Sequence, residues 1–241
     1  MNKFMNSFEG AYMSAKATVA TIQWLRLLKI AISVTVAAML VFVVAGSMFE
    51  EASMFTVSLI PAADKDALGG MEISMSETAD FAEPTIVLSA EGVDNMTNIS
   101  YTWLPTGLDS TDGAHNGENY MAYTFYVKNV GEGPGVLREI INVDSSLLGA
   151  DAAIRVRVTR DGDTTTYAKI GADGLPETGT TPFESDEVVF SNDIPDVQPG
   201  QIIKYTLVIW LEGDDPECLD NIKGGNVKMS MTFEVGETPQ A

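Results

Sequence analysis

The sequence predicts an all-β domain, a β-sandwich or jelly roll, that is preceded by one N-terminal hydrophobic helix. Three observations predict this architecture. An uncharged apolar run covers Ile30–Phe49, apolar and polar residues alternate with a period of two after Met48, and Gly, Pro, Asn and Asp separate the alternating runs. Only residues 144–153 have the composition of a helix after Met48, and that helix would be short.

The apolar run Ile30–Phe49 decides the predicted compartment. Its length matches the roughly 20 residues that cross a bilayer as a helix. Four basic residues precede it and Glu50 and Glu51 follow it, so the positive-inside rule places the N-terminus in the cytoplasm and exports the remainder. The small residues 45–47 fit a signal-peptide cleavage site, but the 29 residues before the run are long for such a peptide. A cleaved signal and a retained membrane anchor therefore both stay open.

The chain divides into an export segment, residues 1–47, and an exported acidic domain, residues 48–241. The domain holds 10 basic and 33 acidic residues, a net charge of −23, which would repel nucleic acid and anionic lipid headgroups. Its single cysteine, Cys218, excludes an intrachain disulfide, and low cysteine use in an exported protein favours a bacterial surface. Residues 48–119 are less regular and, in one interpretation, form a looser N-terminal extension.

Period-two alternation indicates strands with one buried face and one solvated face. In residues 202–210, both faces are apolar, so this strand is expected to be covered on both sides. Asp161-Gly162 predicts a hairpin turn, and Pro199-Gly200 predicts a turn before a strand. The clearest alternating runs are residues 55–59, 71–75, 123–127, 154–158 and 227–233.

Four short motifs carry a resemblance to a known family. They are the small-aromatic stretch at residues 45–49, the strand with Asn and Gly at 126–131, Val-Gln-Pro-Gly-Gln at 197–201, and the turn and last strand at 221–233. Together they resemble the TasA/camelysin (CalY) family of bacterial surface and biofilm-fibre proteins, over about residues 120–235 and the leader.

The resemblance implies a jelly-roll subunit that polymerises by donating its N-terminal strand to the next copy. The donor side chains would be Phe55, Val57 and Leu59, and the alternative is that they belong to an ordinary strand of their own domain. The predicted function is therefore a non-enzymatic extracellular structural protein, a subunit of surface fibres or biofilm matrix, whose partner is itself and which needs no cofactor. A membrane-tethered binding module that recognises a sugar, a protein or calcium is the alternative.

Two acidic loops are the candidate ligand sites. Calcium takes six to eight oxygen ligands from flexible loops, although neither loop has EF-hand spacing, and solvated turn residues are the other interpretation. The candidate ligands are Asp109, Asp112, Asn116 and Glu118 on the first loop, and Asp214, Asp215, Glu217 and Asp220 on the second.

The sequence contains no motif that indicates an enzyme. His115 is the only histidine, whereas an HExxH zinc site needs two, and no nucleophile–base pair is recognisable. A hydrolase is therefore the third-ranked hypothesis. Residues 175–179 spell the sorting motif LPETG, but no apolar stretch and basic tail follow it, so this segment is predicted to be a surface loop between strands.

Overall fold

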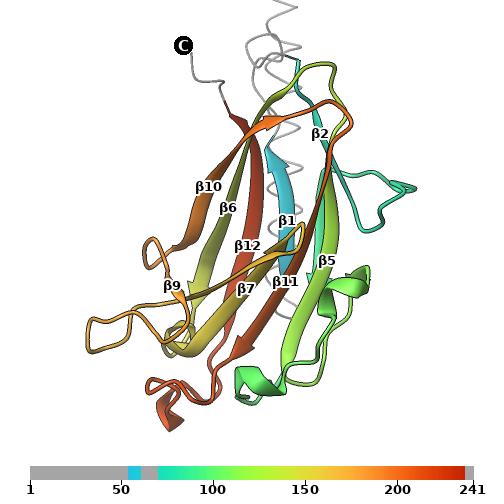
Figure 1. The fold of residues 1–241 in the computed structure, drawn as a ribbon. Coiled ribbons are helices and arrows are strands. Elements are labelled where there is room, and N and C mark those ends of the chain that lie inside the picture. The colour runs from blue at the N-terminus through green and yellow to red at the C-terminus, as the bar shows by residue number, and fades with distance from the viewer. Residues whose placement is uncertain (1–53, 61–69, 237–241) are drawn as a thin grey trace, which may run out of the picture. The chain divides into compact units, whose positions relative to one another are not determined.

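Two β-sheets pack face to face in the computed structural model, which describes residues 54–60 and 70–236 (Figure 1). This packing of two sheets confirms the predicted β-sandwich. The predicted hydrophobic helix at Ile30–Phe49 lies outside the described residues. Within them, no helix is long and apolar enough to span a membrane.

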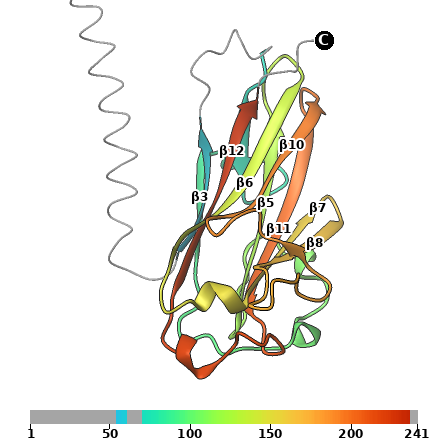
Figure 2. The ribbon, with the colours of Figure 1, turned by 90° about the vertical axis from the view of Figure 1, so that its left-hand side faces the viewer.

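The first sheet has five strands, and Figure 2 shows β3, β12, β6 and β10 as members of one layer. The strand β1 lies between β12 and β3 and is parallel to β12, while the other pairs are antiparallel. In spatial order the strands are β10 (Val188–Val197), β6 (Gly135–Ser146), β12 (Val227–Gly236), β1 (Met54–Ile60) and β3 (Val87–Glu91).

The second sheet has seven strands, and β11 lies in its middle. Its pairs are antiparallel except for β8 with β9. In spatial order the strands are β2 (Ile73–Ser76), β5 (Tyr120–Asn129), β11 (Ile202–Leu211), β7 (Ile154–Arg160), β8 (Asp163–Ala168) and β9 (Thr181–Pro182), and β4 (Gly113–Ala114) also pairs with β5.

Alternate side chains of both sheets meet in one hydrophobic core. Phe233 of β12 lies edge-on to Phe125 and Tyr205 of the opposite sheet, with ring centroids 6.1 and 5.2 Å apart. Phe125 and Tyr205 stack on each other at 5.4 Å. Such aromatic pairs add stabilisation beyond the area that they bury, and here they join the two layers.

The strand β11 is buried on both faces, as its sequence predicts. Tyr205, Leu207 and Ile209 belong to the main core. On the other face, Val208 and Trp210 pack in a second cluster with Ile99, Leu104 and Ala122. The segment between β3 and β4, with its short 3-10 helices η1 (Tyr101–Trp103) and η2 (Leu108–Ser110), therefore covers the outer face of this strand.

The prediction of a helix over residues 144–153 is wrong for most of these residues. The strand β6 continues through Ser146, because Ser145 and Ser146 pair with β12. Gly149 then adopts a positive φ of 70°, outside the helical region, and only a 3-10 turn, η3 (Ala150–Ala153), follows. The predicted hairpin is confirmed, since Asp161 and Gly162 both have positive φ between β7 and β8, as a type I′ turn requires.

Candidate functional site

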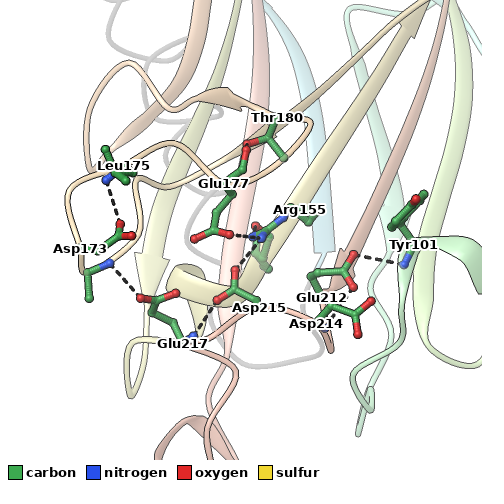
Figure 3. Close-up of polar contacts among 12 residues, drawn as sticks. Tyr101, Arg155, Asp173, Leu175, Glu177, Thr180, Glu212, Asp214, Asp215 and Glu217 are labelled. Atoms are coloured by element: carbon green, nitrogen blue, oxygen red, sulfur yellow. Dashed lines mark hydrogen bonds and ion pairs between the residues drawn. The ribbon is translucent and has the colours of Figure 1, made fainter.

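Three carboxylates from two loops meet beside Arg155 (Figure 3). Glu177 lies on the loop between β8 and β9, and Asp215 and Glu217 lie on the loop after β11. One ligand oxygen from each of the three lies within 4.8 Å of the others. Glu177, Asp215 and Glu217 are called the carboxylate cluster below.

Arg155 is the cation of this site. It is the second residue of β7, its residue surface is only 4% exposed, and its Nη1 donates to the Ile154 carbonyl at 3.3 Å. Its Nη2 lies 2.6 Å from Asp215 Oδ2 and 3.4 Å from Glu177 Oε2. A buried guanidinium is tolerated only when it is paired, so the two loops and Arg155 depend on each other.

Backbone amides fix the carboxylates of the second loop. The Glu217 amide donates to Asp215 Oδ1 at 2.7 Å, which closes a local turn. The Ala172 amide donates to Glu217 Oε1 at 2.8 Å and so joins the loop before β9 to the loop after β11. Within the first of these loops, Asp173 Oδ1 accepts from the Leu175 amide and Glu177 O accepts from Thr180.

Burial makes ionisation costly for two of the three carboxyl groups of the cluster, Asp215 and Glu177. Burial raises the pKa of Asp215, and the carboxyl group of Glu217 beside it raises that pKa further. Burial also raises the pKa of Glu177, with the charge of Asp215 as the second cause. The Ala172 amide lowers the pKa of Glu217, and the adjacent Asp215 side chain lowers it further. The site therefore favours a positive ligand or a proton.

The carboxylate of Glu212 is an adjacent structural anchor. It is buried and accepts hydrogen bonds from the Trp210 indole at 3.0 Å and from the Tyr101 amide at 3.1 Å through Oε2. Its Oε1 accepts from the Asp214 amide at 3.2 Å. Both oxygens thus serve protein donors, and they hold η1 against the end of β11.

The second acidic loop is therefore only partly assembled as predicted. Asp215 and Glu217 come together, but Asp214 accepts a hydrogen bond from Ser100 Oγ at 2.7 Å. Asp220 is exposed and pairs with Lys223 at 2.8 Å. The residues that sequence reasoning missed are Glu177 and Arg155. Glu177 is the acid of the LPETG segment, which the sequence predicts to be a surface loop between strands and not a ligand site.

The first acidic loop does not gather its candidate ligands. Asp112 accepts a hydrogen bond from the Tyr126 hydroxyl at 2.6 Å, and the Asn116 side chain donates to the Glu91 carbonyl at 2.7 Å. Glu118 is exposed. In the described part of the chain, the carboxylate cluster is the one group of acidic, histidine or cysteine ligand atoms that is compact enough to share an ion.

The remaining residue of that loop and its histidine have structural contacts. Lys204 Nζ donates to the backbone oxygen of Asp109 at 2.5 Å. The two ring nitrogens of His115 lie 2.9 Å from the Gly113 carbonyl and 2.8 Å from the Leu108 carbonyl. His115 thereby braces its own loop.

A pocket of about 700 Å³ lies at the end of the sandwich where β1 begins. Met54 and Phe55 of β1 line it, together with Met121 of β5 and Met229 of β12. Cys218 also lines it, and burial raises the pKa of this thiol, so it is not activated as a nucleophile. Methionine side chains adapt to irregular space. Because the pocket borders Met54 and Phe55, the start of β1 is less tightly enclosed than its middle.

Comparisons with known proteins identify no family. No family model matches the sequence, and no curated protein matches it. A solved structure described as "AvmM Catalyzes Macrocyclization in Alchivemycin A Biosynthesis" has 11% sequence identity and a TM-score of 0.21, over 51% of this chain and 82% of that one. A similarity of this size supports no conclusion about function.

Proposed function

We propose that this chain is a non-enzymatic structural subunit of extracellular fibres or biofilm matrix, with a jelly roll like that of the TasA/camelysin family, and that copies assemble by exchanging β1. The observation that carries the proposal is the place of β1. It lies inside a sheet between β12 and β3, parallel to the last strand of the chain. No hairpin joins it to β12, so the same strand from another copy can take its place with the same pairing.

The side chains of β1 fit this role. Phe55 and Val57 are buried in the main core, and Leu59 packs against it. Withdrawal of β1 would leave β12 without one neighbour and would uncover apolar side chains such as Met231 and Phe233 opposite it. Such an open groove is a strong template for another strand.

The pocket lowers the free-energy cost of withdrawing the first residues of β1. Met54 and Phe55 border the 700 Å³ pocket, and side chains beside a void have fewer packing partners than those in a dense core. The strand β3 would lose its partner within the sheet as well, because β1 is its one neighbour among the described strands of that sheet. Exchange restores both interfaces and leaves the number of strand pairs unchanged.

A peptide-competition experiment tests the proposal. Electron microscopy would follow filament formation by the mature protein with and without an excess of a peptide of residues 54–60, MFTVSLI, and with a scrambled peptide as control. We expect the first peptide to suppress filaments and to bind at a 1:1 ratio, as a β-augmenting strand should. Mass spectrometry of the same sample would show whether the N-terminus lies near Met48.

Matched substitutions complete that experiment. Val57→Asp places a charge in the core, whereas Ser58→Asp places one on the half-exposed neighbour in the same strand. We expect filaments from Ser58→Asp and none from Val57→Asp. Monomers at all concentrations, or filaments that both peptides leave unchanged, would refute assembly by exchange of β1.

A second candidate function is a membrane-tethered binding module. The specific observation is a pair of exposed aromatic side chains on η1, Tyr101 and Trp103, which are 63% and 73% exposed. Glu212 and Asp214 hold the start of this turn through the Tyr101 amide and the Ser100 hydroxyl. Rigidly held aromatic faces suit sugar or protein recognition, and retention of Ile30–Phe49 together with glycan binding that Trp103→Ala abolishes would favour this candidate.

A further inference from the structure

The carboxylate cluster has more negative charge than the protein balances. Three carboxylates lie near Arg155, which among the described residues is the one cation paired with the cluster, and it pairs with Asp215 and Glu177 but not with Glu217. Full ionisation therefore leaves an excess of two negative charges in a partly buried site. Burying unbalanced charge is costly, so such a site takes up protons or a cation.

Two buried oxygens of the cluster accept no hydrogen bond from the described residues, and one of them has only an ion pair with Arg155. The Asp215 residue is only 5% exposed, and neither its Oδ2 nor the buried Oε2 of Glu217 accepts a hydrogen bond, although Oδ2 does face Arg155 at 2.6 Å. Buried carboxylate oxygens are normally satisfied. Elsewhere in this chain Glu139 follows that rule, since Tyr205, Arg160 and Asn192 donate to its two oxygens.

We propose that the carboxylate cluster binds one calcium ion, with Glu177, Asp215 and Glu217 as its protein carboxylate ligands. The charge balances, because a divalent cation and Arg155 together neutralise three carboxylates. Oxygen-only ligands select hard cations. Two irregular loops supply them, and this adaptable arrangement suits calcium better than magnesium, which demands near-octahedral geometry and retains its water.

Calcium at this position would join two loops that are far apart in the sequence. Glu177 belongs to the loop between β8 and β9, and Glu217 belongs to the loop that leads into η4 (Asp220–Ile222). Among the described residues, the Ala172–Glu217 hydrogen bond and the ion pairs of Arg155 link these loops at the cluster. The LPETG segment is thereby assigned to metal binding, and this inference stands whether or not β1 is exchanged between copies.

Calorimetry on the full-length chain in mild detergent tests the inference. After removal of metal with EDTA, titration with calcium chloride should show one site, with a Kd of about 10⁻⁴–10⁻³ M as in extracellular modules. Glu177→Gln and Glu217→Gln should each weaken binding by about tenfold or more, since each removes one of three charged ligands. The matched control is Asp220→Asn, which removes a carboxylate from the same loop outside the cluster and should bind like the unmodified chain.

Limited proteolysis supplies a readout that needs no variant. Calcium should slow cleavage between Gly171 and Thr180, and magnesium at the same concentration should protect less. The inference is overturned by an absence of calcium binding in the unmodified chain, by equal loss of affinity in Asp220→Asn, or by equally tight binding of magnesium. Circular dichroism of each variant separates loss of the site from loss of the fold.

Discussion

The loop around residues 109–118 and the loop around residues 212–220 have similar compositions but use their acidic side chains differently. In the first, the carboxylate and amide side chains each have separate protein partners, since Asp112 accepts from the Tyr126 hydroxyl and Asn116 donates to the Glu91 carbonyl. In the second, Asp215 and Glu217 converge with a third carboxylate, and among the described residues Glu217 Oε2 is left without a partner while Asp215 Oδ2 has only its ion pair with Arg155. Acidic composition alone therefore does not indicate an ion site, and the proposed calcium site depends on the convergence of three carboxylates with incompletely paired oxygens.

The largest expected effect comes from the cation of the cluster. Arg155→Met removes the buried partner of Asp215 and Glu177, and breaking a buried ion pair in this way costs about 3–5 kcal/mol of unfolding free energy. Urea denaturation would measure the loss. Lys223→Met is the matched control, because Lys223 is exposed and pairs with exposed Asp220, so its midpoint should hardly change.

Calcium sharpens this prediction. In Arg155→Met the three carboxylates retain their oxygens but lose their protein counterion, so added calcium should recover part of the lost stability through preferential binding to the folded state. No such recovery should follow in a variant that also carries Glu177→Gln. Equal destabilisation by Arg155→Met and Lys223→Met would show that burial of the pair is unimportant.

An intermediate effect is expected for the neighbouring anchor. Glu212→Ala leaves the Trp210 indole and the Tyr101 amide without their acceptor, and unsatisfied buried donors of this kind cost about 2–3 kcal/mol together. Asp214→Ala removes only an exposed bond to Ser100 and should cost about 1 kcal/mol or less. Equal unfolding midpoints for the two variants would contradict the role of Glu212.

The sequence allowed the sandwich to be predicted because local rules govern its strands and turns. Alternation located β1, β7 and β12, and Asp161-Gly162 located a hairpin. The pairing of β1 with β12 was not predictable in this way, since a parallel neighbour from the opposite end of the domain has no local signature. Helix propensity failed at residues 144–153 because strand pairing of Ser145 and Ser146 overrode it.

The carboxylate cluster could also be predicted only in part from the sequence. Asp215 and Glu217 were recognisable from the composition of one loop. Glu177 and Arg155 join them only because the start of β7, the loop before β9 and the loop after β11 lie together in the fold. Tertiary packing decides such a meeting, so a single sequence contains the members of the site but not their association.

The smallest expected effect concerns the loop around residues 109–118 and is a dependence of the free energy of unfolding on pH. Burial raises the pKa of Tyr126 to about 12, and its hydrogen bond to Asp112 and the charge of that carboxylate contribute further. The folded chain therefore holds this phenolic proton more tightly than the unfolded chain, whose tyrosine titrates near 10.0. The resulting stabilisation is complete below about pH 10 and is lost as the pH rises towards about 12.

Asp112→Asn isolates this contribution. It removes the charged acceptor and leaves the burial of Tyr126 in place, so the Tyr126 phenol should ionise at a lower pH than in the unmodified chain. A difference titration of the near-ultraviolet absorbance of the two chains would measure this change. Tyr126→Phe supplies the blank, because it removes the titrating group itself. Calcium should not alter the Tyr126 transition, since Asp112 already serves a protein donor. A calcium-dependent shift at Tyr126 would erase the distinction between the two acidic loops.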